Sequence, residues 1–325
     1  MKIFRHYRDV PDASKGAVVA LGNFDGVHLG HQALIGAARD LAHANGAPLG
    51  VVAFEPHPQE FFRPSPESFR LTPFRVKARL IAELGAQILY ALTFDAEMAE
   101  KSAEDFVIDV LVKALGVSAI VVGEDFQFGK GRKGNTALLT AMGAEKGFGV
   151  SLFKPVPGGG HDKISSTQIR DALKQGRPEE AARLLGHYWS IESRVDHGDK
   201  RGRTIGFPTL NMKLADSLQP AFGIYAVRAR VLEDEKVVST HEGVASFGIR
   251  PMYEVATPLL ETFLFDFAGD LYGKHMAVDF VAYIRPEAKL DSLEALKEQI
   301  ARDSEAARKA LAAARPAAGN PAEPG

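Results

Sequence analysis

The sequence of 325 residues contains no cysteine. Disulfide bonds, thiolate zinc sites and cysteine nucleophiles are therefore excluded, and the chain is compatible with a reducing compartment. No segment approaches the roughly 18 consecutive apolar residues that a membrane-spanning helix needs. The first nine residues carry charges instead of the apolar run of a signal peptide. From these absences we expect a cytoplasmic protein without a membrane partner.

An excess of charge of one sign is also missing, because 39 basic residues stand against 41 acidic ones. The chain has no overall field to attract nucleic acid or an anionic membrane, so we expect no nucleic-acid partner. Any phosphate binding must come from a local arrangement of residues. With 46% hydrophobic and 25% charged residues, the composition is that of a globular protein, and the length suggests about two domains.

Short apolar runs alternate with longer helical patterns up to residue 185, which is typical of a parallel sheet with crossover helices. This half is expected to be α/β, with an N-terminal doubly wound, Rossmann-like parallel sheet. The expected strands are 17–21, 49–54, 87–92, 119–122 and 150–153, and the expected helices are 32–42, 74–84, 102–115, 136–146 and 166–174.

After Gly186 the pattern changes to strands without intervening helices, at 188–195, 223–232, 242–247, 260–267 and 275–284. An antiparallel β-barrel is the simplest fold for this half. Turn residues at 234–235 and 268–270 stand between such runs and are typical of hairpins. A terminal helix is expected at 293–312, started by Asp291 or Ser292. We therefore predict domains at 1–185 and 186–312, followed by a disordered tail at 313–325.

The first chemical signal is a glycine-rich run after the first strand, Gly22-Asn23-Phe24-Asp25-Gly26-Val27-His28-Leu29-Gly30-His31. Open α/β sheets bind ligands at the carboxyl ends of their strands. The N–H groups and dipole of a helix N-terminus attract anions, and two imidazoles there add directional donors for phosphate oxygens. A His-x-x-His pair by itself is also a common surface or capping feature. The surrounding glycines, which let the backbone approach a triphosphate, favour phosphate binding over metal binding.

Two further segments of this half carry polar signals. Ser165, Ser166 and Thr167 stand at a helix start with Arg170 one turn later, so one hydroxyl can cap the helix while the others bind phosphate. A plain capping sequence is the alternative. The loop 129–134 fits Gly-x-Gly-x-x-Gly, but its spacing from the strand and the absence of an acidic residue near position 154 argue against a dinucleotide fold. We interpret it as a flexible basic loop near a phosphorylated substrate.

The second chemical signal is Gly206-Phe207-Pro208-Thr209-Leu210-Asn211, which ends a basic, glycine-rich segment that starts at His197. Such a loop can wrap phosphates with backbone N–H groups. Thr209 and Asn211 are two residues apart, so they share a face of an extended strand, and their oxygens suit Mg²⁺. The alternative is a hairpin with an ordinary Pro-Thr turn.

Together with 54–58 and 123–129, the N-terminal motifs resemble the FAD synthetase module of prokaryotic bifunctional riboflavin kinase/FMN adenylyltransferases. The histidine motif alone is shared with other nucleotidyltransferases and class I aminoacyl-tRNA synthetases. The resemblance implies direct attack of the FMN phosphate on the α-phosphorus of ATP, with catalysis by positioning and charge stabilisation. It implies four catalytic residues that hold the triphosphate with Mg²⁺, namely His28, His31, Ser165 and Arg170. It also implies ATP or flavin contacts from Gly22, Asn23, Phe24, Asp25, Gly26, Gly30, Phe54, His57, Asp125, Phe128, Gly129 and Ser166.

The C-terminal half resembles the riboflavin kinase of the same family through the segments 206–211, 222–227, 261–267 and 271–274. This resemblance implies Glu261 as the general base for the ribityl 5′-hydroxyl and Thr209 and Asn211 as Mg²⁺ ligands. It also implies ATP or flavin contacts from Gly198, Lys200, Gly206, Pro208, Gly223, Tyr225 and Arg285. One departure is that Ile249 and Met252 stand where the family has threonines, in a loop near the flavin site.

We therefore expect an enzyme that phosphorylates riboflavin to FMN and adenylylates FMN to FAD, with ATP as co-substrate and Mg²⁺ as cofactor. A regulatory flavin- or nucleotide-binding protein with one inactive module is an alternative of another class. The retained His28, His31, Arg170 and Glu261 argue against it, because binding alone would not require all of them. An adenylyltransferase for another phosphorylated metabolite would leave the C-terminal half unexplained.

Overall fold

The computed structural model describes residues 1–65, 67–154, 163–196, 207–214, 216–249, 258–289 and 291–314. The chain forms two compact units, Met1–Pro66 with Phe74–Ser165, and Glu67–Pro73 with Ser166–Gly325. Each is described here by itself. Helices α7 (Ser166–Lys174) and α8 (Pro178–Leu185) contribute apolar residues to the core of the second unit. The compact units therefore divide at Ser165, whereas the functional boundary at residue 185 stays a prediction.

The first unit contains a parallel sheet of order β1-β4-β3-β2-β5-β8. Its strands are β1 (Lys2–Phe4), β2 (Val18–Leu21), β3 (Leu49–Glu55), β4 (Ile88–Thr93), β5 (Ala119–Gly123) and β8 (Gly149–Phe153). The last five match the strands expected from the apolar runs. The edge strand β1 was missed because its three residues are largely exposed and too short to show a pattern.

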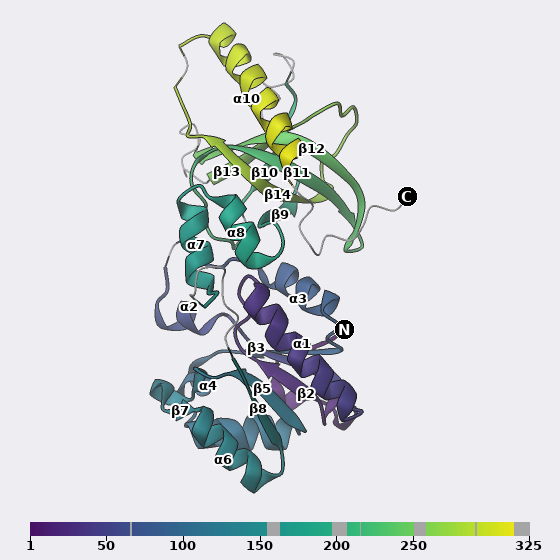
Figure 1. The fold of residues 1–325 in the computed structure, drawn as a ribbon, viewed down its shortest axis with the longest axis vertical. Coiled ribbons are helices and arrows are strands. Elements are labelled where there is room, and N and C mark those ends of the chain that lie inside the picture. Colours follow the sequence, from purple (N-terminus) through teal and green to yellow (C-terminus); the bar gives the residue numbers. More distant parts are fainter. Residues whose placement is uncertain are drawn as a thin grey trace. The chain divides into compact units, whose positions relative to one another are not determined.

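Helices cover both faces of this sheet (Figure 1), as the doubly wound prediction requires. In β2, Val18 and Ala20 share an apolar cluster with helices α1 (Leu29–Ala44) and α3 (Phe74–Glu83). Val19 and Leu21 point to the other face and share a cluster with the π-helical η3 (Phe106–Ala114) and with α6 (Thr136–Lys146). The shorter elements are η1 (Tyr7–Asp9), η2 (Asp12–Ser14), α2 (Pro58–Phe62), α4 (Ala96–Glu100), α5 (Ala103–Asp105), β6 (Gln127–Phe128), η4 (Lys130–Arg132) and β7 (Gly134–Asn135).

The order of the strands reverses at β2. From β2 the chain adds β3 and β4 on one side and later crosses to β5 and β8 on the other. In an open α/β sheet such a switch point creates a ligand-binding crevice beyond the carboxyl ends of the two strands concerned. The glycine-rich run with its two histidines begins directly after β2, so it lies at this point.

The second unit contains an antiparallel sheet of order β10-β13-β12-β11-β14-β9. Its strands are β9 (Ser190–Arg194), β10 (Thr209–Lys213), β11 (Gly223–Glu233), β12 (Lys236–Ile249), β13 (Pro258–Leu264) and β14 (His275–Arg285). The backbone N–H of Asp196 donates to the carbonyl of Asn211 at 2.8 Å, which joins the two ends of this order. The expected barrel is therefore confirmed.

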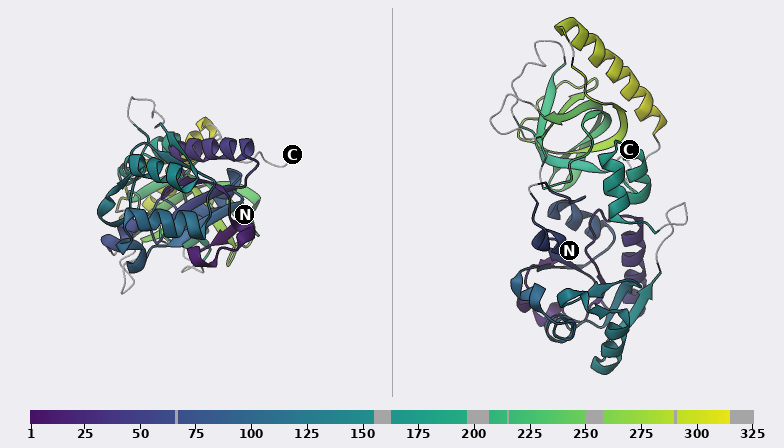
Figure 2. Two further views of the ribbon diagram at one scale, coloured as in Figure 1. Left: turned by 90° about the horizontal axis from the view of Figure 1, so that it is seen from below. Right: turned by 90° about the vertical axis from the view of Figure 1, so that its left-hand side faces the viewer.

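The terminal helix α10 (Leu293–Ala313) packs over β11, β12 and β14 (Figure 2). The hydroxyl of Ser292 caps it by accepting a hydrogen bond from the N–H of Ala295 at 3.1 Å, as the sequence predicts. The helix includes Ala313, the first residue of the predicted tail, and residues 315–325 lie outside the described part of the chain. Within the described ranges, every helix is too short or too polar for a membrane span.

Of the two predicted hairpin turns, one is confirmed and one is wrong. Asp234 and Glu235 join β11 to β12 and have positive φ angles of 47° and 65°, as a two-residue turn of type I′ requires. Residues 268–270 do not close a hairpin, because β14 pairs with β11 and β9, and β13 pairs with β12 and β10.

Candidate functional site

The loop after β2 is a tight turn whose apolar side chains are buried. Phe24, Gly26 and Val27 have positive φ angles of 53°, 84° and 43°, and Phe24 and Val27 are each only 1% exposed. Their packing beside α1 and α3 holds a backbone conformation that non-glycine residues rarely adopt. The buried side chains therefore fix the position of His28, which directly precedes α1.

His28 is the N-cap of α1. Its Nδ1 accepts a hydrogen bond from the backbone N–H of His31 at 3.2 Å. A nitrogen that accepts a hydrogen bond carries no proton, so the proton of the neutral ring is on Nε2. A Cβ at Gly30 would lie 3.2 Å from Cε1 and Nδ1 of His28, which explains the glycine between the two histidines. The cap thus orients Nε2 as a hydrogen-bond donor at the helix N-terminus.

His31 stacks on His28, with ring centroids 3.5 Å apart and an interplanar angle of 15°. The edge of Phe24 contacts the same ring at a centroid distance of 5.2 Å. Burial holds the pKa of His31 well below its ordinary value of 6.5, and electrostatic interaction with His28, Lys163 and Lys77 lowers this pKa further. His31 is therefore a neutral imidazole at pH 7, able to donate a hydrogen bond to an anion.

Asp125 lies just beyond the other strand of the switch point, β5. Its carboxylate accepts a hydrogen bond from Nζ of Lys163 at 2.6 Å, and this bond lowers the pKa of Asp125. The two side chains are 69% and 47% exposed, so the pair contributes little to stability. Lys163 lies two residues before the half-buried Ser165, so the pair links the loop after β5 to the segment that holds this serine.

Aromatic side chains form a continuous cluster in the first unit. Phe54, near the end of β3, contacts Phe94 and Phe106 at centroid distances of 5.6 and 6.0 Å. Phe106 then contacts Phe128 at 5.8 Å, and Phe128 stacks on Phe126 at 5.7 Å. The predicted ligand-binding residues Phe54 and Phe128 therefore belong to one aromatic cluster, in which Phe54 is half-buried and Phe128 is 7% exposed.

The short helix α2 adds two aromatic residues that the sequence reasoning missed. Phe61 and Phe62 each pack on Phe94, at 5.5 and 5.7 Å, and are 38% and 62% exposed. Exposed aromatic rings beside a site suit a planar apolar ligand. The sequence signal that could have identified them is their position shortly after the Pro-His-Pro run. His57, predicted as a ligand contact, caps α2 by accepting from the N–H of Gln59 at 3.1 Å.

The basic loop at 129–134 is anchored rather than flexible, contrary to our interpretation of the sequence. A Cβ at Gly129 would lie 2.6 Å from the backbone nitrogen of Ala103, and one at Gly134 would lie 2.8 Å from the Cβ of Ala103. The N–H of Lys130 donates to the carbonyl of Lys101 at 2.7 Å. Close packing on α5 therefore explains these two glycines.

Arg170, predicted to hold the triphosphate, and Ser166, predicted to contact ATP or flavin, belong to the second compact unit. Nε of Arg170 donates to the carbonyl of Phe69 at 2.7 Å, and its guanidinium carbon lies 4.8 Å from the centre of the Phe69 ring. These contacts fix the direction of the guanidinium within that unit. The contact of Arg170 with a triphosphate and that of Ser166 with ATP or flavin stay predictions.

In the barrel, strand register places three predicted residues on one face. Asn211 of β10 lies opposite Glu261 of β13, and Thr209 lies opposite Phe263. Directly opposite residues of antiparallel strands share a face, as do residues two apart in a strand. Thr209, Asn211 and Glu261 therefore share a face, and Asn211 is 8% exposed. The general base and the metal ligands expected from the sequence thus lie on neighbouring strands.

The donors on this face fit a hard cation such as Mg²⁺. The hydroxyl of Thr209 and the amide oxygen of Asn211 are hard oxygen ligands, and the carboxylate of Glu261 on the neighbouring strand adds negative charge beside them. In the part of the chain that the structure describes, no cluster of three or more His, Cys, Asp or Glu residues could hold a metal. The oxygen donors on this face therefore suit a cation that takes its remaining ligands from phosphate and water, as Mg²⁺ does.

Packing explains two of the predicted ligand-binding residues in the barrel. Tyr225 is 1% exposed and donates to the carbonyl of Ala221 at 2.5 Å, and burial raises the pKa of its hydroxyl. A Cβ at Gly223 would lie 2.5 Å from the carbonyl oxygen of Arg285 and from Cε2 of Tyr283. Both residues are therefore parts of the barrel core and its close strand contacts.

Arg285, also predicted to contact a ligand, forms a two-point ion pair with Asp303 of α10. Its Nε and one terminal nitrogen donate to the carboxylate at 2.8 and 2.7 Å, and this pairing raises the pKa of Arg285. Asp303 is 4% exposed. The pair ties β14 to the terminal helix, which accounts for the arginine without a ligand.

The remaining predicted residues of this half lie at the ends of the described segments or outside them. Pro208 is exposed just before β10, and Ile249, which ends β12, is 42% exposed. Gly198, Lys200, Gly206 and Met252 lie outside the described residues.

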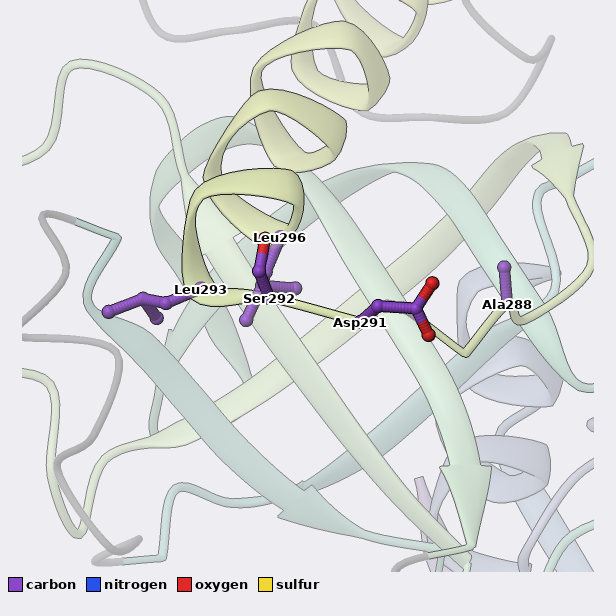
Figure 3. A pocket seen from close by; sticks show the side chains of 5 residues that line it. All are labelled: Ala288, Asp291, Ser292, Leu293 and Leu296. Atoms are coloured by element: carbon purple, nitrogen blue, oxygen red, sulfur yellow. The ribbon is translucent and has the colours of Figure 1, made fainter.

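A surface pocket of 480 Å³ lies between the end of the barrel and the start of α10 (Figure 3). It was not expected from the sequence, and it is lined by Ala288, Asp291, Ser292, Leu293 and Leu296. Ser292 caps the helix, and Asp291 is the charged residue among those that line the pocket.

Comparisons with known proteins match the two halves separately. A family model described as FAD synthetase matches residues 10–168, and one described as riboflavin kinase matches residues 185–311. The two matches follow one another in the order that the motifs indicate.

Full-length relatives carry both activities in their names. The chain is 41% identical to the bifunctional riboflavin kinase/FMN adenylyltransferase of Escherichia coli K12, over 98% of this chain and all of that protein. It is 39% identical to the protein of the same name from Listeria monocytogenes, over 90% of this chain and 91% of that one.

A solved structure from Streptococcus pneumoniae is also similar, with a TM-score of 0.83 and 31% identity over 94% of this chain and 98% of that one. That structure is described as a macrolide-efflux protein. The two family matches and the identity over nearly the full length of both chains agree with each other. The chain belongs to the family of bifunctional riboflavin kinase/FMN adenylyltransferases.

Proposed function

We propose that this enzyme phosphorylates riboflavin to FMN with the barrel of its second unit and adenylylates FMN to FAD with the first unit. ATP is the co-substrate of both reactions. The observation that carries the proposal is that one chain combines a stacked histidine pair at a sheet switch point with an Asn-Glu pair on a barrel face. A protein that only bound a nucleotide would need neither arrangement in full.

In adenylyl transfer, the FMN phosphate attacks the α-phosphorus of ATP and pyrophosphate leaves. Nε2 of His28 and the neutral ring of His31 donate to phosphate oxygens at the N-terminus of α1, where the N–H groups and helix dipole attract anions. Ser165 supplies a further hydroxyl. These donors stabilise the charge that develops on the leaving group, and no covalent intermediate is needed.

Substrate orientation in the first unit is assigned to the loops around the switch point. The exposed Asn23 and the carboxylate of Asp125 lie beyond β2 and β5 and would orient the substrates. The aromatic cluster with Phe54, Phe61 and Phe128 would bind the flavin ring, whose planar apolar surface matches it.

In phosphoryl transfer, Glu261 accepts the proton of the ribityl 5′-hydroxyl as this oxygen attacks the γ-phosphorus of ATP. Thr209 and Asn211 would hold Mg²⁺, which neutralises charge on the phosphate oxygens when it is bound. The register of β10 and β13 supports this assignment, because it sets Asn211 opposite Glu261.

Two single substitutions test the division of labour. His31→Ala should stop FAD formation from FMN and leave FMN formation from riboflavin unchanged. Glu261→Ala should stop FMN formation and leave FAD formation unchanged when FMN is supplied. Both are measured by separating the flavins chromatographically after incubation with ATP and Mg²⁺. If either substitution abolished both reactions in folded protein, the proposed division would be wrong.

A further inference from the structure

A buried ion pair lies in the first unit outside the residues assigned so far. Nζ of Lys77, in α3, lies 3.1 Å from Oε2 of Glu55, the last residue of β3. The two side chains are only 5% and 11% exposed. Lysine and glutamate are rarely buried unless they are paired, and removing two charges from water offsets most of their mutual attraction. Stability alone is therefore a weak explanation for this pair.

The pair lies beside the histidine loop. Strand β3 neighbours β2, with Val52 opposite Leu21, so Glu55 extends past the start of the loop at the carboxyl edge of the sheet. On α3, Ala78 and Ile81 pack in the same apolar cluster as Phe24 and Val27, the buried residues of that loop. The helix that carries Lys77 therefore supports the turn that presents the histidines.

We propose that Lys77, held by Glu55, is a positioning residue for adenylyl transfer that acts through His31. This inference rests on the proposed function of the first unit. The buried cation disfavours a second positive charge beside it, so it keeps the stacked imidazoles neutral and in contact. It also adds positive potential where the triphosphate accumulates negative charge.

The charged groups around His31 make this role specific. The groups whose electrostatic interaction lowers the pKa of His31 are His28 from its own loop, Lys163 from the segment after β8, and Lys77 from α3. Two buried acidic groups belong to the same part of the unit, Asp25 in the histidine loop and Glu55 in β3. Lys163 is 47% exposed and paired with an exposed carboxylate, so solvent screens its charge. Lys77 is the buried cation of the set, so water screens its charge least, and the Glu55 carboxylate at 3.1 Å offsets part of that charge.

The test is the pH profile of FAD formation from FMN and ATP by the full chain. The double variant Lys77→Met with Glu55→Gln removes both charges, so no buried charge is left without a partner. We expect its kcat to fall roughly tenfold with little change in the KM for ATP, since remote mispositioning costs rate at the reacting centre. We expect the acidic limb of its profile to move to higher pH, because protonation of His31 becomes easier. Lys77→Arg, which keeps the charge, should keep the parent's acidic limb.

The control is Lys113→Met, which breaks an exposed ion pair of the same unit, between Lys113 and Asp109 at 3.0 Å. It should behave like the parent. A double variant with the parent's rate and pH profile would overturn the inference, and so would a thermal melting temperature well below the parent's, which would indicate a structural role. A matching shift in the Lys113 variant would also overturn it. If the parent itself made no FAD from FMN, the proposed function would fail instead.

Discussion

At the scale of single residues, the histidine site depends on how closely the residues around it pack. Gly30 leaves room for the His28 ring against the first turn of α1. The stacked rings and the buried Phe24 then place His31 in an environment that keeps it uncharged. One prediction follows from the close contact between position 30 and the His28 ring, and another follows from the burial of His31.

Gly30→Ala should slow FAD formation roughly tenfold, because its Cβ would press on the His28 ring and displace Nε2 from the phosphate. The measurement is the rate of FAD formation from FMN and ATP. Gly36→Ala is the matched control, since this glycine lies in the same helix with no atom within 4 Å of an added Cβ. The control should keep its rate and gain about 0.5–1 kcal/mol of stability. Equal rates for the two variants would refute the crowding argument.

The burial of His31 also predicts how stability depends on pH. The unfolded chain protonates this histidine below its ordinary pKa of 6.5, whereas the folded chain, with its lowered pKa, does not. The unfolded state therefore binds more protons as pH falls. The stability due to this group is complete above pH 6.5 and is lost between that value and the folded-state pKa.

Urea unfolding at pH values of about 7.5 and about 5.5 measures this effect. His31→Asn should lose less stability on acidification than the parent does. His43→Asn, a change at an exposed histidine of the same helix, should lose as much as the parent. An unchanged acid sensitivity in the His31 variant would contradict the proposed neutral state of this ring.

At the scale of elements, the sequence predicted the helices and strands whose apolar residues recur at a regular spacing or whose first residue is a clear cap. The helices at 136–146 and 166–174 have the expected bounds, and Ser292 caps α10 as predicted. The missed β1 has only three residues and buries none of them. The false hairpin at 268–270 arose because turn residues mark where the chain reverses but not which strands then pair. Pairing is set by the closure of the barrel, which local patterns do not report.

The site residues were predictable where a motif specifies them and not where packing does. The motifs identified His28, His31, Asn211 and Glu261. Ring stacking brings the two histidines together, and strand register places Asn211 opposite Glu261. Gly223 and Tyr225 lie in a family motif and Arg285 does not, and all three make contacts within the barrel or with α10 that local patterns do not report. Phe61, Phe62 and the buried Lys77 were missed, because burial and ring contacts depend on tertiary neighbours.

The ion pair between Arg285 and Asp303 is one of the contacts that hold α10 on the barrel, beside the apolar cluster with Ala307 and Leu311. Asp303→Ala should lower the free energy of unfolding by about 3 kcal/mol, because it leaves the partly buried Arg285 without its partner. Glu305→Ala, on the same helix, breaks an exposed pair with Lys309 and should leave stability unchanged. Chemical denaturation of the two variants checks both expectations. Equal midpoints would show that the Arg285–Asp303 pair does not hold the helix.

At the scale of the whole molecule, the account depends on two chemistries in one chain. The histidine loop by itself indicates nucleotidyl transfer, and the barrel face by itself indicates phosphoryl transfer to a hydroxyl. Each half matches its own family model, and relatives of nearly the same length carry both. The product of the barrel reaction, FMN, is the substrate of the other, so the two sites form consecutive steps.

The most direct test follows both flavin products over time in one reaction of the purified parent with riboflavin, ATP and Mg²⁺. The account predicts that FMN rises first, that FAD then forms at its expense, and that pyrophosphate appears in step with FAD. A reaction started from FMN should give FAD without a lag. Riboflavin that stays unchanged, together with FMN that is not converted to FAD, would contradict the central claim.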